Sequence, residues 1–149
     1  MIRGYKYGNL IDLAKAGNYD NIAHGCNCMC TMKSGIAPQI ADAFPEAWEA
    51  DQATEKGAVS KLGTFSKGSI VYNLYTQYTF TGRRRGIPDI DYKALADAFR
   101  ALNDDMGSGL LGIPKIGAGL AGGDWDTIER LINENTPNID IEVVLWKAG

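Results

Sequence analysis

The sequence predicts an α/β sandwich, and two features of the chain lead to this prediction. Segments typical of strands and of helices alternate, and several of the strand segments are almost wholly apolar. With 149 residues the chain is long enough to form one domain with a hydrophobic core, so we expect a single domain over residues 1–149. Ligands of such folds bind at the carboxyl ends of strands, where loops lead into helices.

The first half of the chain alternates between expected strands and helices. The strand segments are Ile2–Tyr7, Asn21–Asn27 and Ser69–Thr76, of which the last is rich in β-branched and aromatic residues. A short helix closed by a glycine is expected over Leu10–Gly17. A second helix is expected over Ile36–Phe44, because its apolar residues recur at helical spacing up to Pro45.

The second half of the chain continues the alternation. The helix signal is clearest in Asp91–Met106, where Asp91 can serve as the N-cap. One face of this helix carries the apolar residues Tyr92, Leu95, Ala96, Phe99 and Leu102. A short buried strand that runs into a loop is expected over Gly109–Gly117. A helix with an acidic first turn follows over Asp124–Asn135. The apolar segment Ile139–Trp146 is typical of a strand that is central or covered on both faces.

Composition and charge exclude several classes of function. The chain has 15 Lys and Arg against 18 Asp and Glu, a formal charge of −3, so we expect no general nucleic-acid binding. One local basic segment, Gly82–Gly86, carries three arginines, which is the pattern of a solvated loop tip. No segment approaches the roughly 18–20 apolar residues of a membrane helix, and the start of the chain lacks the apolar core of a signal peptide. We therefore expect a cytoplasmic monomer with no membrane partner.

The segment Ala23–Pro38 contains the single histidine and all three cysteines, which raises the question of a metal site. The spacing C-x-C-x-C of Cys26, Cys28 and Cys30 differs from the C-x₂₋₄-C pairs of zinc sites, and the sequence has no second pair downstream. Free cysteines commonly pack as small buried hydrophobic residues. The sequence therefore favours cysteines packed beneath a loop, and we expect neither a metal nor a cofactor.

Two glycine-containing loops each lie between an expected strand and an expected helix. Gly35 stands at the entry of a helix, where exposed amide groups bind anions. The second loop has four glycines between Gly117 and Gly123, and glycine permits a close approach of backbone to ligand. Together the two loops favour a diphosphate-like ligand.

These segments resemble the macro domains, a family of ADP-ribose-binding proteins. The resemblance covers nearly the whole chain and is carried by Gly8–Ala14, Asn21–Ala47 and, most specifically, Gly112–Trp125. Within the family, His24–Cys28 and Ile113–Gly119 are most similar to the branch of ADP-ribose 1″-phosphate phosphatases, as is Tyr72–Gln77. The resemblance implies a three-layer α/β/α sandwich with a central mixed sheet and an ADP-ribose cleft at the strand ends.

The resemblance also implies a set of substrate-binding residues. Asn9 and Leu10 match the adenine-side loop; the family usually has an aspartate where Asn9 stands, and an amide can still accept that hydrogen bond. Asn27 matches the residue that contacts the distal ribose. The residues that match the loop near the ribose and diphosphate are Lys33, Ser34, Gly35, Ile36 and Ala37. Those that match the diphosphate loop are Gly117, Ala118, Gly119, Leu120, Ala121 and Gly122.

Two residues are candidates for catalysis of phosphate hydrolysis. Asp124 can act as a general base, or can only cap the helix that follows it. His24 titrates near neutral pH and can act as acid or base, or can pack as a strand residue beneath the ribose loop. Lys33 could contact a terminal phosphate, and Tyr75 and Gln77 could line the distal pocket.

Two alternatives to the phosphatase stay open. A neighbouring branch of the family removes ADP-ribose from protein or nucleic acid, and its lysine nucleophile follows a strand similar to Tyr72–Thr76. Here the stretch Thr76–Gly86 contains arginines but no lysine, and an arginine is too basic to be a nucleophile. The other alternative is a reader that binds ADP-ribose without catalysis.

Overall fold

The computed structural model describes residues 1–82, 86, 88–119 and 121–146 of the chain. They form a six-stranded sheet in the order β1-β6-β5-β2-β4-β3. The strands are β1 (Ile2–Gly8), β2 (Asn21–Cys26), β3 (Phe65–Gly68), β4 (Val71–Tyr75), β5 (Leu110–Ile113) and β6 (Asp140–Trp146). Neighbouring strands are parallel except β3 and β4, which pair antiparallel, so the sheet is mixed as expected.

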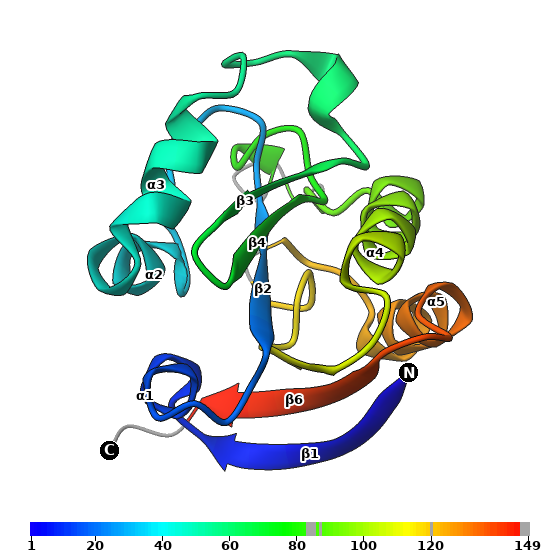
Figure 1. The fold of residues 1–149 in the computed structure, drawn as a ribbon. Coiled ribbons are helices and arrows are strands. Elements are labelled where there is room, and N and C mark those ends of the chain that lie inside the picture. The colour runs from blue at the N-terminus through cyan, green and yellow to red at the C-terminus, as the bar shows by residue number, and fades with distance from the viewer. Residues whose placement is uncertain (83–85, 87, 120, 147–149) are drawn as a thin grey trace.

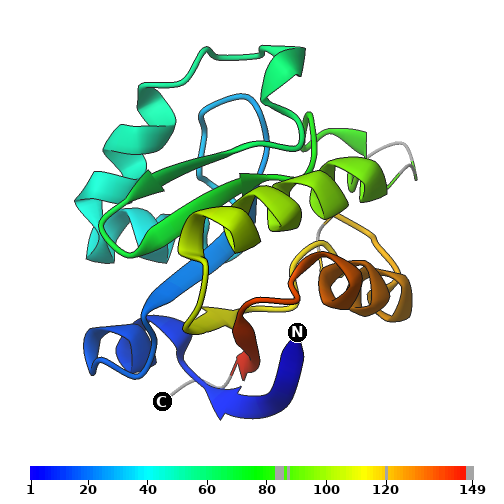
Figure 2. The ribbon, with the colours of Figure 1, turned by 45° about the vertical axis from the view of Figure 1, so that its right-hand side comes forward.

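Helices cover both faces of this sheet (Figures 1 and 2). One side carries α1 (Leu10–Lys15), α2 (Ala37–Ala43) and α3 (Pro45–Gln52), and the other side carries α4 (Tyr92–Met106) and α5 (Trp125–Asn135). The 3-10 turn Val59–Lys61 leads from α3 towards β3. The arrangement confirms the predicted α/β/α sandwich.

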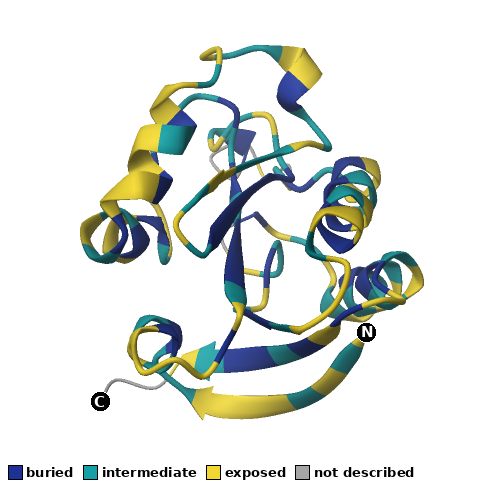
Figure 3. Cartoon of the chain, in the orientation of Figure 1, coloured by how far each residue is buried: buried dark blue, intermediate teal, exposed yellow. Residues whose placement is uncertain are grey.

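Each layer of helices has its own apolar core against the sheet. In Figure 3 both layers of helices and the sheet between them carry buried residues. On the side of α4 and α5, Phe99 and Ile128 pack in one cluster with Leu111 of the sheet. On the other side, Leu10 and Ile40 pack in a second cluster with strand residues that include Ile22. Strand β6 lies between β1 and β5, as its apolar sequence predicted.

The sequence prediction does not contain helix α3 or strand β3, and it differs from the structure in the exposure of one residue of α4. Pro45 ends α2 but also begins α3, because the missing amide hydrogen of proline costs nothing in the first turn of a helix. Strand β3 has only four residues and lies at an edge of the sheet. Tyr92, expected on the buried face of α4, is 38% exposed, and its hydroxyl oxygen accepts a hydrogen bond from the amide of Asp124.

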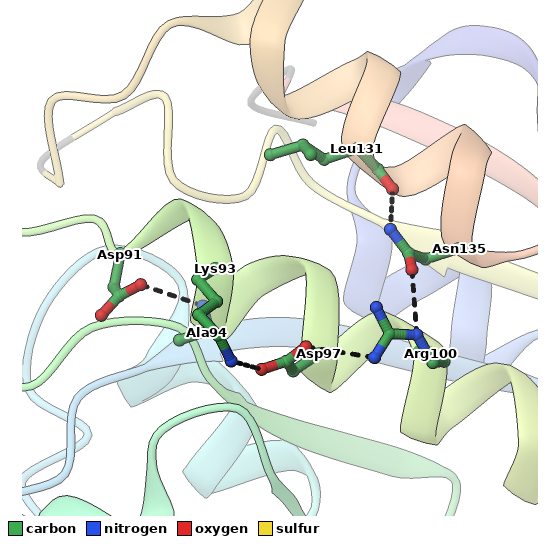
Figure 4. Close-up of polar contacts among 7 residues, drawn as sticks. All are labelled: Asp91, Lys93, Ala94, Asp97, Arg100, Leu131 and Asn135. Atoms are coloured by element: carbon green, nitrogen blue, oxygen red, sulfur yellow. Dashed lines mark hydrogen bonds and ion pairs between the residues drawn. The ribbon is translucent and has the colours of Figure 1, made fainter.

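Polar contacts fix the start of α4 and join it to α5 (Figure 4). Asp91 is the N-cap, as predicted, and its Oδ1 accepts a hydrogen bond from the amide of Ala94 at 2.9 Å. Asp97 bonds Lys93 and Arg100 on the same helix. Arg100 Nε then donates to Asn135 of α5 at 3.2 Å, which ties the two helices together.

Helix α3 begins in close contact with the end of β3. A Cβ atom built on Gly68 would lie 2.0 Å from the carbonyl oxygen of Glu46 and 2.7 Å from the amide nitrogen of Ala47. The absence of a side chain at Gly68 therefore sets how closely α3 approaches the sheet. None of the helices in the described part of the chain has both the length and the apolar character needed to cross a membrane.

Candidate functional site

A cavity of about 210 Å³ lies at the carboxyl end of β2, between the two loops that the sequence singled out. From the first loop (residues 27–36) and the start of α2 it is lined by Asn27, Met32 and residues 33–37. From the second loop (residues 114–124) it is lined by residues 114–117, 119 and 121. Its charged lining residues are Lys33, Asp51, Asp89 and Lys115.

A second cavity of about 450 Å³ extends from the first towards the ends of β1 and β6. Its wall is mainly apolar and includes Leu10, Val144, Leu145 and Trp146. The two cavities share Gly35, Ile36, Pro114 and Lys115 as lining residues. They therefore form one elongated cleft with a common middle wall, which we call the joined cleft.

Side chains of the first loop make hydrogen bonds within the loop itself. Asn27 Oδ1 accepts a hydrogen bond from the amide of Met29, and Asn27 Nδ2 donates to the hydroxyl of Thr31. Cys30 and Met32 both adopt left-handed backbone conformations, with φ of 58° and 43°. Such conformations cost about 1–2 kcal/mol for residues other than glycine, so contacts elsewhere must hold the loop in place.

The second loop exposes backbone groups to the smaller cavity. Gly117 and Gly122 have φ of 79° and 76°, and the amide of Gly123 closes the loop by donating to the carbonyl of Gly117 at 2.7 Å. A Cβ atom on Gly119 would meet no atom within 4 Å, because this residue faces open space. The loop thus leaves room for a ligand beside its backbone.

Most of the predicted substrate-binding residues come together in the joined cleft. The predicted residues that line it are Leu10, Asn27, Lys33, Ser34, Gly35, Ile36, Ala37, Gly117, Gly119 and Ala121. Two members of the second loop do not line it: Ala118 packs against the apolar core, and Gly122 bonds back to the carbonyl of Gly119. Leu120 and the arginines Arg83–Arg85 lie outside the described residues.

Asn9 lies immediately before α1, between two residues, Gly8 and Leu10, that line the larger cavity. Its Oδ1 accepts hydrogen bonds from the amides of Ile11 and Asp12, so the side chain is the N-cap of α1. It does not line either cavity. The oxygen that was expected to accept a hydrogen bond from a ligand is therefore already used within the protein.

His24 lies in the protein interior rather than in the cleft. It is 1% exposed, and its Nε2 is 2.6 Å from Asn73 Oδ1. Because Asn73 donates its own amide hydrogens to Ala47 and Ser66, its oxygen is the acceptor and His24 Nε2 carries a hydrogen. Burial lowers the pKa of His24 to about 4, against an opposing effect of the bond to Asn73. His24 thus has the position of a core strand residue, which was the alternative to its role as acid or base.

Asp124 is also placed outside the cleft. It is the N-cap of α5, and its Oδ2 accepts hydrogen bonds from the amide and the hydroxyl of Thr127 at 3.0 and 2.7 Å. These bonds lower the pKa of the Asp124 carboxyl group. Since Asp124 lines neither cavity, the geometry supports its role as a cap and not as a general base.

The cysteines pack around the start of the first loop. Cys26 and Cys28 are buried with Tyr75 in a small apolar cluster, and burial raises the pKa of both thiols. Cys30 is half-buried, 3.4 Å from Lys61 Nζ. Among the described residues, no group of three or more His, Cys, Asp or Glu side chains is arranged to hold a metal ion.

Sequence reasoning missed a buried polar network behind the smaller cavity. Asp51 of α3 is 1% exposed and lines this cavity, and its Oδ1 accepts a hydrogen bond from the hydroxyl of Tyr75 at 2.7 Å. Lys61 is buried nearby, donates to the carbonyl of Cys28 and lies over the ring of Tyr75. Burial raises the pKa of Asp51, while the bond from Tyr75 and the charge of Lys61 lower it.

Three further lining residues were not among the predicted site residues. Pro114 and Lys115 lie within the segment Ile113–Gly119 that carried the resemblance, whereas Trp146 lies outside any motif, at a strand end that the fold rule alone could have indicated. Gln77, expected to line the distal pocket, does line the smaller cavity. Tyr75 does not; it is fully buried behind Asp51.

Comparisons with known proteins agree with this architecture. No protein-family model matches the chain. An uncharacterised 17.5 kDa protein from the tk-vs intergenic region of Enterobacteria phage T4 is 37% identical over 160 residues, covering 99% of this chain and 98% of that protein. A solved Bacteroides thetaiotaomicron protein of unknown function has a TM-score of 0.74 at 23% identity, covering 97% of this chain and 98% of its own.

Two solved macrodomains share the fold. The macrodomain of Thermus aquaticus DarG has a TM-score of 0.70 at 18% identity and covers 97% of both chains. The Trypanosoma brucei macrodomain, solved in complex with ADP-ribose, has a TM-score of 0.65 at 15% identity, covering 97% of this chain and 63% of its own. These similarities confirm the macrodomain fold.

Proposed function

This chain belongs to the same protein family as the phage T4 protein, and on the macrodomain fold that it adopts we propose that its joined cleft binds ADP-ribose. The observation that carries the proposal is the pair of cavities that meet at Gly35, Ile36, Pro114 and Lys115. A molecule made of a nucleoside, a diphosphate and a second sugar has the elongated, three-part form of this cleft. The T. brucei macrodomain with the same fold was solved with this ligand.

The chemistry of the walls supports one orientation of the ligand. The larger cavity is mainly apolar and has an indole, Trp146, which suits a nucleobase. The shared wall combines the cation of Lys115 with the backbone of Gly35, which suits a diphosphate. The smaller cavity then receives the terminal ribose.

The second part of the proposal is hydrolysis of ADP-ribose 1″-phosphate to ADP-ribose and inorganic phosphate. In this reaction water forms a bond to phosphorus while the bond between phosphorus and the C1″ oxygen breaks. Lys33 lines the smaller cavity and is exposed, which supports a contact between its ammonium group and the terminal phosphate. A reader without catalysis is favoured by one observation: neither His24 nor Asp124 lines the cleft.

The test measures binding and turnover separately. Isothermal titration calorimetry with ADP-ribose is expected to show one site per chain, and no heat of binding would contradict the proposal as a whole. Incubation with ADP-ribose 1″-phosphate is expected to release inorganic phosphate in proportion to enzyme concentration. Binding without release would leave a reader, and release of ADP-ribose from modified protein or DNA would instead identify the de-ADP-ribosylating activity.

The substitution Trp146→Ala is expected to weaken ADP-ribose binding by roughly 5- to 100-fold, the loss expected when an aromatic platform for a base is removed. Trp146 is 55% exposed, so the fold itself should be little affected. Tyr7→Ala is the matched control, because Tyr7 is 71% exposed on the adjacent strand and lines neither cavity. If calorimetry gives the two variants the same affinity for ADP-ribose, the nucleobase does not contact Trp146.

The substitution Lys115→Met is expected to reduce ADP-ribose affinity by roughly tenfold or more, since it removes a cation at the shared wall and keeps an unbranched apolar side chain. Wild-type affinity should fall as salt is raised, and the variant should respond less. Lys6→Met, an exposed lysine of β1 outside both cavities, is the control. An unchanged salt response in Lys115→Met would place the diphosphate elsewhere.

A further inference from the structure

The smaller cavity is bordered by a buried carboxylate with one oxygen unused. Asp51 Oδ1 accepts a hydrogen bond from Tyr75, whereas Asp51 Oδ2 is buried and has no hydrogen-bond partner. Only one other buried side-chain atom in the described part of the chain, Thr76 Oγ1, lacks a partner. Both therefore require an explanation, because nearly all buried polar atoms are paired.

These two atoms belong to the same end of the sheet. Thr76 follows the last residue of β4, and its hydroxyl lies 2.9 Å from the Cβ position of Gly25, which lines the smaller cavity. Asp51 lines the same cavity from α3. Thr76 does not line the cavity, so of the two side chains with an unpaired atom only Asp51 borders it.

The carboxylate is fixed in its position by its neighbours. Tyr75 is fully buried, and its hydroxyl also contacts Ser66 at 2.8 Å, so it holds Asp51 Oδ1 in one orientation. Burial raises the pKa of Asp51, and the nearby positive charge of Lys61 opposes that shift. A buried carboxylate with one oxygen held and the other free can accept a further hydrogen bond without rearrangement of its partners.

We propose that Asp51 is a specificity-determining residue of the cleft, whose Oδ2 accepts a hydrogen bond from a hydroxyl group of the ligand's terminal sugar. This inference rests on the proposed binding of ADP-ribose and adds a residue that the sequence motifs do not contain. A carboxylate accepts hydrogen bonds from sugar hydroxyls, whereas the oxygens of a phosphodiester offer it no donor. Asp51 therefore selects a hydroxyl-bearing sugar for the inner end of the smaller cavity and keeps the diphosphate at the shared wall.

The experiment compares ADP-ribose with ADP, which has the same nucleoside and diphosphate but no terminal sugar. The variant is Asp51→Asn, in which the amide oxygen can still accept from Tyr75 while the free position becomes a donor without charge. We expect the variant to bind ADP-ribose about 10- to 100-fold more weakly than wild type and to bind ADP within about twofold of wild type. Glu49→Gln, on the exposed side of the same helix, is the control and should change neither affinity.

Each outcome of these titrations decides one question. The inference is overturned if Asp51→Asn binds ADP-ribose as tightly as wild type, or if the variant loses affinity for ADP by the same factor as for ADP-ribose. In both cases the proposed binding of ADP-ribose stands. If wild type binds neither compound, the proposed function fails and takes the inference with it. Thermal unfolding checks that the variant is folded. If Asp51→Asn is not folded, Tyr75→Phe is used in its place. Loss of the hydroxyl that orients Asp51 should reduce the ratio of the affinities for ADP-ribose and ADP. An affinity ratio equal to that of wild type overturns the inference.

Discussion

Lowering the pH from about 7 to 4 is expected to remove about 3 kcal/mol of folding free energy through His24 alone. The folded-state pKa of His24 is lowered to about 4 from 6.5 because the side chain is buried. Between these two pH values the unfolded chain binds a proton that the folded chain does not bind. Stability is therefore complete above about pH 6.5 and is lost as the pH falls to 4, at about 1.4 kcal/mol for each unit of pKa difference.

The measurement is a series of urea unfolding curves between pH 7.5 and 4 for wild type and His24→Gln. His24 is the single histidine of the chain, and a glutamine amide can still donate to Asn73 Oδ1. Carboxyl groups that titrate in this range are present in both proteins, so their contributions cancel when the two pH profiles are subtracted. Parallel pH profiles for the two proteins would show that His24 does not carry the effect.

The substitution Gly68→Ala is expected to lower the free energy of unfolding by roughly 3 kcal/mol, the upper part of the range for an overpacked interior site. The new Cβ would lie 2.0 Å from the carbonyl oxygen of Glu46, and a backbone atom cannot move aside as a flexible side chain does. Helix α3 would have to shift away from β3. Since α3 carries Asp51, we also expect the preference for ADP-ribose over ADP to decrease.

Chemical denaturation measures the loss of stability, and Gly4→Ala provides the matched control. Gly4 also lies in a strand, but a Cβ atom there meets nothing within 4 Å. The control should stay within about 0.5 kcal/mol of wild type. Equal stability of Gly68→Ala and Gly4→Ala would mean that α3 does not depend on the close approach to β3.

The layers and most elements of the fold could be predicted because their signals are local. Asp91 caps α4 and the apolar strand β6 is internal, both as the sequence indicated. Helix α3 was missed because Pro45 is a terminator for the preceding helix and a favourable first residue for the next one, and sequence alone does not separate the two. Strand β3 was missed because four residues at a sheet edge carry little pattern.

The candidate site could be predicted only where its residues lie in motifs. Both glycine-containing loops line the cleft. They could be predicted because a strand end followed by the start of a helix is recognisable in sequence. His24 and Asp124 each had two interpretations that only their contacts could separate. Asn9 had one, a contact to the ligand, and its side chain instead caps α1. Asp51 carried no signal, because its neighbours Tyr75 and Lys61 are distant in sequence and only the fold brings them together.

The left-handed residues of the first loop couple ligand binding to the docking of α3. Cys30 contacts the carbonyl oxygens of Asp51 and Thr54 through its sulfur, and Gln52 donates to its carbonyl at 2.7 Å. The loop shape that lines the cleft is thus imposed by the end of a helix more than 20 residues away. By thermodynamic linkage, a ligand that binds only the ordered loop must also hold α3 in place, and loosening of α3 must weaken binding to the same extent. Affinity and local stability in this region are therefore two measures of a single equilibrium.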